Sequence, residues 1–211
     1  MASSPRLLLV RHGETNENVQ GIVQGQLDTP LNDLGRRQAA MTGEALRDAP
    51  IMRIVSSPLT RALHTAEAIA QHHTNVPVET DARIMERNFG VLQGKVYRGP
   101  SQKPDDTEGI ESREAMTARL RAFYDDLRVT AARTPGTTVL VSHGGALSAL
   151  MNTVLFADGH VALAPDVQPS RFWNCSISEI DLTNTPAVLR RWADVAHLTD
   201  PTRVANVDEG L

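Results

Sequence analysis

The sequence predicts an α/β fold in which short buried strands alternate with amphipathic helices. Three short apolar runs, at residues 7–10, 51–55 and 137–142, are typical of parallel strands that are covered on both faces. Between them the chain carries apolar residues at helical spacing, most clearly over 59–70 and 116–131. Glycines and prolines separate these segments, as expected for short connections in such a fold.

The first strand, Leu7–Val10, is followed directly by Arg11, His12 and Gly13. In an open α/β sheet, ligands bind just beyond the carboxyl ends of the strands. A cation, an imidazole and a glycine at that position indicate an anion-binding site that contains a nucleophile. This strand end is therefore the predicted centre of the functional site.

The first half of the chain supplies the elements next to this strand end. In order, they are a polar loop at 15–29, a helix over 34–47 capped at Asn32-Asp33, a strand at 51–55, a helix that starts at Ser56-Ser57-Pro58 and an edge strand at 76–79. Arg61 lies in the first turn of the second helix, off its apolar stripe. A cation there is mildly unfavourable, by ~0.3–1 kcal/mol, unless it shares an anion with the helix amides.

The second half repeats the pattern of buried strand, histidine and glycines. In order, it contains a glycine-punctuated segment at 83–94, a lid without secondary structure at about 95–111, a helix over 111–132, a strand at 137–142 that ends in His143-Gly144-Gly145, a helix through 147–154, a second lid loop at 157–171 and paired strands at 175–182 and 187–192. The tail after about residue 201 is predicted to be poorly ordered.

Length and composition favour one domain over residues 1–211. The net charge of −4 and the pI of about 6.0 give no support to binding of nucleic acid or of an anionic membrane. Cys175 is the single cysteine, so an intrachain disulfide is excluded and a reducing compartment is favoured. With no signal peptide and no run of membrane-spanning length, the expected location is the cytoplasm.

Two histidines and two arginines at strand ends and helix starts, with a carboxylate on a loop, need one chemical explanation; they are His12, His143, Arg11, Arg61 and Glu86. The spacing of zinc ligands is missing, and so are a serine nucleophile elbow and a glycine-rich nucleotide loop. Phosphoryl transfer to a histidine fits, because fixed cations stabilise the charge on the phosphoryl oxygens and a carboxylic acid protonates the leaving oxygen. This chemistry requires no metal and no cofactor.

The same residues resemble the signature of the histidine phosphatase superfamily, which is also called phosphoglycerate mutase-like. Five blocks appear in family order: Arg11-His12-Gly13-Glu14-Thr15 with Asn18, Gln24-Gly25, Ser57-Pro58-Leu59-Thr60-Arg61-Ala62, Glu86-Arg87-Asn88-Phe89-Gly90 and Ser142-His143-Gly144-Gly145. The match runs from about residue 7 to about residue 150. It implies a three-layer α/β/α sandwich with a central, mostly parallel mixed sheet.

The resemblance also implies a role for each matching residue. His12 would become phosphohistidine, and Glu86 would protonate the leaving group and then act as base for water. Arg11, Arg61 and His143 would hold the transferred phosphoryl group, assisted by Asn18 and the amide of Gly144. Gln24, Gly25 and Arg87 lie where the family contacts the rest of the substrate. His12 must attack as a neutral imidazole whereas His143 works better charged, so the two histidines are expected to have environments that separate their pKa values.

Three functions are consistent with these blocks. The first is a metal-independent phosphatase acting on small phosphorylated metabolites such as sugar phosphates or phosphoglycerate-like compounds. The short lid and brief tail favour this one, because they would leave phosphohistidine accessible to water. The second is a phosphoglycerate mutase that depends on a bisphosphate primer. The third is a non-catalytic phosphate-binding protein, against which the intact set of site residues argues. Since the fold often pairs, the resemblance adds a homodimer to the expectations.

Overall fold

A computed structural model describes residues 4–97, 108–131 and 135–199 of the chain. Its strands are β1 (Arg6–Arg11), β2 (Ile51–Ser56), β3 (Val78–Thr80), β4 (Thr137–Ser142), β5 (Val161–Leu163), β6 (Ile177–Asp181) and β7 (Ala187–Asp194). Its α-helices are α1 (Asn16–Gln20), α2 (Asp33–Ala45), α3 (Thr60–Ala70), α4 (Arg113–Ala131) and α5 (Gly144–Ala149). Two short 3₁₀ helices, η1 (Ala82–Ile84) and η2 (Gly90–Leu92), flank the segment with Glu86, and a π-helix, η3 (Leu150–Phe156), continues α5.

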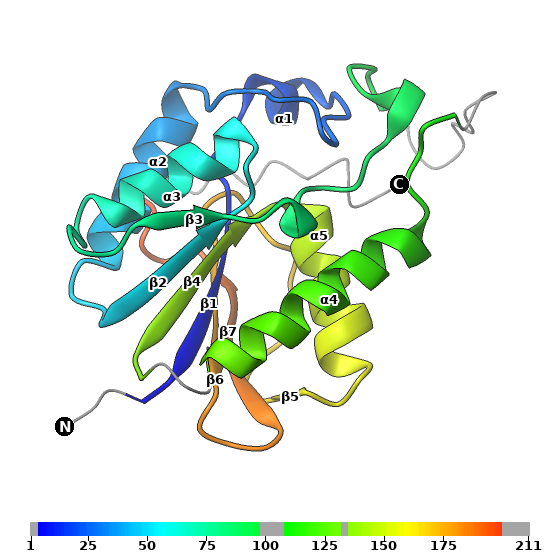
Figure 1. Ribbon diagram of the computed structural model, residues 1–211. Coiled ribbons are helices and arrows are strands. Elements are labelled where there is room, and N and C mark those ends of the chain that lie inside the picture. Colours follow the sequence, from blue (N-terminus) through cyan, green and yellow to red (C-terminus); the bar gives the residue numbers. More distant parts are fainter. Residues whose placement is uncertain (1–3, 98–107, 132–134, 200–211) are drawn as a thin grey trace.

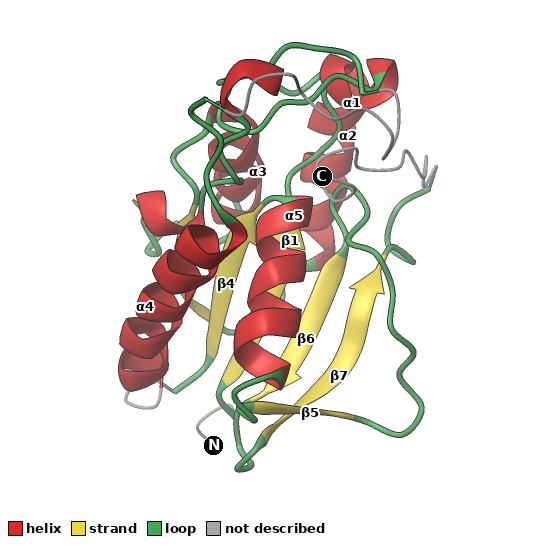
Figure 2. Ribbon diagram, turned by 90° about the vertical axis from the view of Figure 1, so that its right-hand side faces the viewer, coloured by secondary structure: helices red, strands yellow, loops and turns green. Residues whose placement is uncertain are grey.

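The strands form one seven-stranded sheet in the order β3-β2-β4-β1-β6-β7-β5. The pairs β1–β4, β2–β4, β2–β3 and β5–β7 are parallel, whereas β6 runs antiparallel to both of its neighbours. Helices α2 and α3 cover one face and α4 and α5 cover the other (Figures 1 and 2). The predicted three-layer sandwich with a mostly parallel mixed sheet is confirmed.

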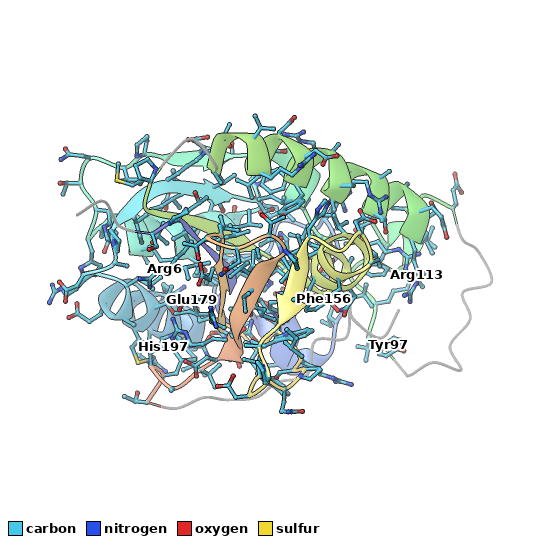
Figure 3. The ribbon with its side chains drawn as sticks, turned by 90° about the horizontal axis from the view of Figure 1, so that it is seen from below. Arg6, Tyr97, Arg113, Phe156, Glu179 and His197 are labelled. Carbon is cyan, nitrogen blue, oxygen red and sulfur yellow. The ribbon has the colours of Figure 1, made fainter. Side chains whose placement is uncertain are left out.

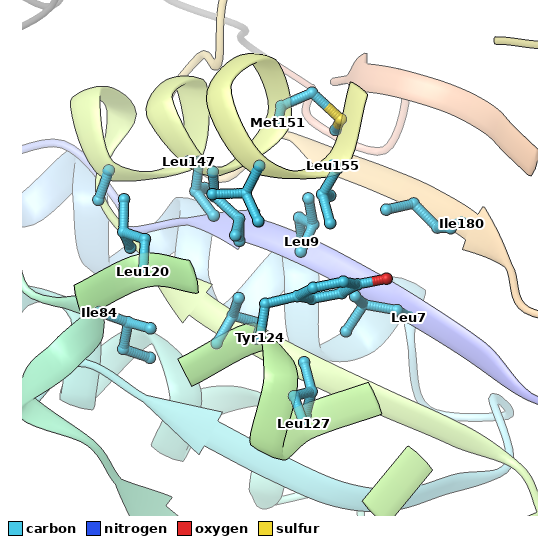
Figure 4. Packing of buried hydrophobic residues seen from close by; sticks show 14 of the residues in the cluster. Leu7, Leu9, Ile84, Leu120, Tyr124, Leu127, Leu147, Met151, Leu155 and Ile180 are labelled. Carbon is cyan, nitrogen blue, oxygen red and sulfur yellow. The ribbon is translucent and has the colours of Figure 1, made fainter. Parts of the chain in front are cut away.

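Strand β1 lies at the centre of the sheet and is buried on both faces. Leu7 and Leu9 pack with α4 and α5, where Tyr124 and Leu147 lie close to them (Figure 4). Leu8 belongs to the cluster that includes the apolar stripe of α3 on the other face. Burying each such leucine contributes ~1.5–3 kcal/mol, so the strand that leads to His12 is among the best-anchored parts of the molecule.

The strand register brings the predicted site residues to one edge of the sheet. Arg11, the last residue of β1, pairs with Ser142, the last residue of β4. The His12 amide donates to the Ser142 carbonyl at 3.0 Å, and the Ser57 amide donates to the Val141 carbonyl at 2.9 Å. The residues that follow β1, β2 and β4 therefore meet at the carboxyl edge of the sheet.

A close backbone contact holds α2 against this edge. A Cβ atom on Gly13 would lie 2.5 Å from the Gly35 carbonyl oxygen, and one on Gly35 would lie 2.0 Å from the carbonyl oxygen of Glu14. Both distances are impossible for a real side chain, so only glycine allows the start of α2 to lie this close to the end of β1. At the opposite end of the sheet, Arg6 forms an exposed ion pair with Glu179 at 3.2 Å (Figure 3).

Two local predictions in the first half of the chain were wrong. The loop predicted at 15–29 contains helix α1, which Thr15 and Asn18 stabilise through a reciprocal capping box. The second helix begins at Thr60 rather than at Ser56-Ser57-Pro58. Its cap comes from a distant segment, because the Asp28 carboxylate accepts hydrogen bonds from the Thr60 amide at 2.6 Å and the Thr60 hydroxyl at 2.8 Å.

In the second half, the loop predicted at 157–171 contains β5, which pairs in parallel with β7. Most of the lid predicted at 95–111 and nearly all of the tail lie outside the described residues. No helix among the residues that the structure describes is long and apolar enough to cross a membrane.

Candidate active site

His12 and His143 lie side by side at the carboxyl edge of the sheet. Their ring centroids are 5.2 Å apart, and both residues are almost completely buried. His143 Nε2 is 2.8 Å from the Ser57 hydroxyl. Its Nδ1 is buried and makes no hydrogen bond with any residue that the structure describes, so this nitrogen is available to a ligand.

The hydrogen bond of His12 fixes its tautomer. Nδ1 lies 2.7 Å from the carbonyl oxygen of Gly13, the next residue. Since a carbonyl only accepts hydrogen bonds, Nδ1 carries the proton. In the neutral ring, Nε2 then holds the unshared electron pair that a nucleophile needs.

Arg11 and Arg61 place two buried guanidinium groups near these histidines. Arg11 follows from β1 and donates through Nη1 to the Phe172 carbonyl at 2.7 Å. Arg61 lies in the first turn of α3, where its Nη atoms donate to the carbonyls of Gly25 and Leu27, each at 2.7 Å. Both side chains are at most 1% exposed, so each charge acts in a medium where screening is weak.

Glu86 provides a buried carboxyl group on the segment between η1 and η2. Its Oε1 accepts from the Arg87 amide and its Oε2 from the Gly145 amide, each at 2.9 Å. A Cβ atom at position 145 would lie 2.6 Å from Glu86 Oε1, so the carboxyl group rests directly against the glycine at the start of α5.

The environment shifts the pKa of each of these titratable groups. Burial, then the charges of Arg61 and Arg11, lower the pKa of His12 well below 6.5, although the Gly13 carbonyl opposes this. Burial and Arg61 likewise lower the pKa of His143 well below 6.5. Both pKa values thus shift in the same direction, because both rings share one buried cationic cluster, and the expected separation between them stays a prediction. Burial raises the pKa of Glu86 against the hydrogen bonds from Arg87 and Gly145.

Asn18 is linked to the backbone of His12, because Asn174 Nδ2 donates to both the His12 carbonyl and Asn18 Oδ1. Its Oδ1 accepts from the Thr15 amide at 3.2 Å and from Asn174 Nδ2 at 3.3 Å. Its own Nδ2 is buried and has no hydrogen-bond partner within the described part of the chain. That donor is therefore suited to an anionic oxygen.

Two of the other residues expected to contact substrate or phosphate, Gln24 and Gly25, form hydrogen bonds within the protein. Gln24 is buried, and its Oε1 accepts from the hydroxyls of Thr15 at 3.0 Å and Thr29 at 2.6 Å. Gly25 supplies a carbonyl that holds Arg61. Gly144 is buried at the first position of α5, next to His143.

Arg87 borders a pocket of about 240 Å³ that begins at Glu86. Arg113, Ser148 and Asn152 also line this pocket. Arg113 lies at the first residue of α4 (Figure 3). The lining of the pocket thus combines a carboxyl group with two guanidinium groups.

One supporting segment, residues 172–175, was not predicted from the sequence. Asn174 Nδ2 donates to the His12 carbonyl at 3.0 Å, and the Cys175 amide donates to the Arg11 carbonyl at 3.1 Å. The segment precedes β6, which runs antiparallel to β1, and this arrangement places its residues at the site edge. The signal in the sequence is the antiparallel pairing of β6 with β1, because it implies that residues 172–175 lie next to the end of β1. Cys175 is fully buried, and burial raises the pKa of its thiol to about 12.

Among the residues that the structure describes, no cluster of three or more histidine, cysteine or acidic side chains could hold a metal ion. The groups that converge on this edge are two imidazoles, two guanidinium groups, an amide and a carboxyl group. Together they can bind a phosphoryl group, attack it and protonate a leaving oxygen.

Comparisons with known proteins give the same assignment. The family model described as "Histidine phosphatase superfamily (branch 1)" matches residues 7–195. A relative named "Probable phosphoglycerate mutase GpmB" from Yersinia pestis (strain Pestoides F) is 35% identical over 215 residues, covering 93% of this chain and 96% of the relative.

Two solved structures are also similar. A mycobacterial glucosyl-3-phosphoglycerate phosphatase in complex with VO3 is 28% identical, with a TM-score of 0.73 over 91% of this chain and 100% of that chain. The phosphoglycerate mutase of Bacillus anthracis str. Sterne shares the fold, at 21% identity and a TM-score of 0.75 over 99% of this chain and 97% of that chain. The chain belongs to the histidine phosphatase superfamily, and it is an enzyme of the phosphatase or mutase kind.

Proposed function

We propose that this member of the superfamily is a metal-independent phosphatase that hydrolyses small phosphomonoesters through a phosphohistidine on His12. The observation that carries the proposal is the hydrogen bond from His12 Nδ1 to the Gly13 carbonyl. It leaves Nε2 unprotonated within a buried group of cationic and neutral donors. Because the pKa of His12 is lowered, the ring stays neutral and nucleophilic at pH values where an exposed histidine is protonated.

The reaction would proceed in two balanced steps. His12 Nε2 forms a bond to phosphorus while the bond to the leaving oxygen breaks, and Glu86 donates its proton to that oxygen. Water then attacks the phosphohistidine, Glu86 takes a proton from the water, and the P–N bond breaks to release phosphate. Arg11, Arg61 and His143 would stabilise the oxygens of the transferred group in both steps.

The pKa values support this assignment of roles. The raised pKa of Glu86 favours the protonated form that the first step consumes. A phosphoryl dianion would counteract the effect of the arginines on His143 and raise its pKa, so that His143 could bind the phosphoryl group as a cation.

The pocket beside Glu86 supports a leaving group that carries a second anionic or strongly polar group. Arg87 and Arg113 line it together with Glu86, the residue that would protonate the leaving oxygen. A phosphoglycerate-like or sugar phosphate substrate would place a carboxylate or hydroxyls there. The names of the two relatives, a phosphoglycerate mutase and a glucosyl-3-phosphoglycerate phosphatase, agree with this class.

The test is phosphate release from a panel of phosphomonoesters with EDTA present. We expect release by the wild-type protein and by His64→Ala, which alters an exposed histidine on α3, and none by His12→Ala. Rapid quenching at alkaline pH should trap phosphate on the wild-type and His64→Ala chains and not on His12→Ala. Release that persists in His12→Ala would contradict the proposal.

A mutase is the second candidate, because the relative at 35% identity carries that name. It predicts transfer of phosphate between positions of a phosphoglycerate, and a requirement for a bisphosphate primer. Transfer that exceeds phosphate release in the presence of the primer would favour the mutase.

A further inference from the structure

Arg119 connects helix α4 to the segment that carries Glu86. Its Nη1 donates to the carbonyls of Arg83 at 2.6 Å and Met85 at 2.7 Å. Its Nη2 donates to the carbonyl of Glu86 itself at 3.1 Å. One guanidinium group therefore satisfies three carbonyls of a segment that belongs to neither a strand nor an α-helix.

Glu111 holds this guanidinium group in place. Its Oε1 accepts from Arg119 Nε at 2.6 Å and its Oε2 from Arg119 Nη2 at 2.9 Å, which is a bidentate pair. Although burial raises the pKa of Glu111, the hydrogen bonds and charge of Arg119 outweigh it, and the pKa is lowered. Both side chains are less than one fifth exposed, so solvent screens the pair only partly.

The same glutamate also fixes the two residues that follow Glu86. Glu111 Oε2 accepts from the Asn88 amide at 3.1 Å, and the Glu111 carbonyl accepts from Arg87 Nε at 2.7 Å. The Glu111 amide donates to the Asn88 carbonyl at 2.8 Å. Arg119 and Glu111 thus form hydrogen bonds with the backbone on both sides of Glu86, the proposed proton donor.

These contacts determine where the Glu86 carboxyl group lies. Its far side rests on the Gly145 amide at the start of α5, whereas its backbone is held from α4. A general acid acts only within about 2.6–3.2 Å of the oxygen that it protonates. A shift of about 1 Å at such a group can cost about 10²-fold in rate.

We propose that Arg119, braced by Glu111, is the positioning residue for the Glu86 carboxyl group. The inference rests on the proposed function, and it predicts a loss of acid catalysis without a loss of the nucleophile. The hydrogen bonds of Arg119 go to Glu111 and to the backbone of residues 83–86, so its main effect is expected through Glu86. Its charge is also the last of the causes that lower the pKa of His143.

The experiment compares two substrates that need the acid to different degrees. An alkyl phosphate has a poor leaving group that must be protonated, whereas 4-nitrophenyl phosphate has a good one that needs little help. In Arg119→Met, kcat/KM for the alkyl phosphate should fall by about 10²-fold while kcat/KM for 4-nitrophenyl phosphate falls far less. Arg119→Lys should recover part of the loss, because lysine keeps the charge but not the planar fork.

The matched control is Arg121→Met. Arg121 lies on the same helix, but its hydrogen bonds go to Asp158 and to the Thr153 carbonyl and not to the segment with Glu86. The Arg121→Met variant should leave kcat/KM for both substrates unchanged. Equal losses on both substrates in Arg119→Met, or no loss on the alkyl phosphate, would overturn the inference. If Arg119→Met does not fold, Glu111→Gln carries the same comparison.

A titration of Glu86 by NMR separates this inference from the proposed function. In wild-type protein the carboxyl group should titrate above its usual pKa because it is buried. In Arg119→Met the pKa should move back toward the usual value as the carboxyl group gains solvent, and in Arg121→Met it should not. A wild-type protein that releases no phosphate would refute the proposed function, but this shift would still support the positioning role. An unchanged pKa would overturn the role.

Discussion

The two halves of the site are held by different kinds of interaction. His12 follows a central strand, and its backbone is fixed by the Ser142 carbonyl and by donors from residues 174 and 175. Glu86 lies between two short 3₁₀ helices, and its position depends on Arg119, Glu111 and the Gly145 amide. The proposed nucleophile is thus held in place by the sheet, whereas the proposed acid is held mainly by hydrogen bonds from side chains.

This difference indicates which half of the site a single substitution can shift. A strand position can change only if the register changes, and that would move every side chain of β1 to the other face. The acid can be shifted by replacing a single contact. Substitutions around Glu86 should therefore alter the dependence on the leaving group, while substitutions around His12 should affect stability and all substrates alike.

The largest effect that tests this comparison is expected for Glu86→Gln. It removes the transferable proton, so kcat/KM for alkyl phosphates should fall by about 10²–10⁴-fold and that for 4-nitrophenyl phosphate should fall less. Glu67→Gln, an exposed residue on α3, is the control. Steady-state kinetics on both substrates decide the matter, and a uniform loss would show that Glu86 does not act as the acid.

Gly145→Ala should have the next largest effect, because its Cβ would lie 2.6 Å from Glu86 Oε1. The carboxyl group must move away, and we expect a loss of about 10–10²-fold that again falls mainly on alkyl phosphates. The loss should disappear in the Glu86→Gln background, since the two changes act on one group. Full additivity in this double-mutant cycle would indicate a separate structural effect.

Asn174→Ala probes the other half. It deprives the His12 carbonyl and Asn18 Oδ1 of a buried donor, which should lower the free energy of unfolding by about 1–3 kcal/mol. Because the sheet still holds His12, kcat/KM should fall only a few-fold and equally for both substrates. Urea unfolding measures the first quantity, with the exposed Asn184→Ala as control. A large loss that depends on the leaving group would break the distinction between the halves.

The smallest effect is a pH dependence of stability that originates at the two histidines. Their pKa values are lowered on folding, so below about pH 6.5 the unfolded chain takes up protons that the folded chain does not. The free energy of unfolding should therefore decrease as the pH falls, by up to about 1.4 kcal/mol per pH unit for each histidine. Urea unfolding at pH 7.5, 6.5 and 5.5 measures this change in the free energy of unfolding. A His12→Gln, His143→Gln double variant should have a shallower dependence, and an unchanged slope would contradict the assignment.

The sequence was sufficient to predict the sheet and the half of the candidate site that contains the two histidines. Apolar runs that end in Arg-His-Gly and His-Gly-Gly mark strand ends, and parallel pairing brings strand ends together. His12 and His143 could therefore be placed in one site before their 5.2 Å separation was known.

The sequence was not sufficient where long-range contacts override local signals. The start of α3 depends on Asp28, and the position of Glu86 depends on Arg119, which is 33 residues away in the chain. No local pattern marks either partner. The common downward shift of the two histidine pKa values was not predicted for a related reason, because two motifs far apart in the sequence do not show that their rings are buried together.

The hydrogen bond from His12 Nδ1 to the Gly13 carbonyl also determines which isomer of the intermediate can form. With Nδ1 engaged, only Nε2 can accept phosphorus, so the proposed reaction would form τ-phosphohistidine and not the π isomer. The two isomers are distinguished by the chemical shifts of the ring carbons and by isomer-specific antibodies. A main-chain carbonyl thus gives the protein a regiochemical signature that can be detected without knowledge of its substrate.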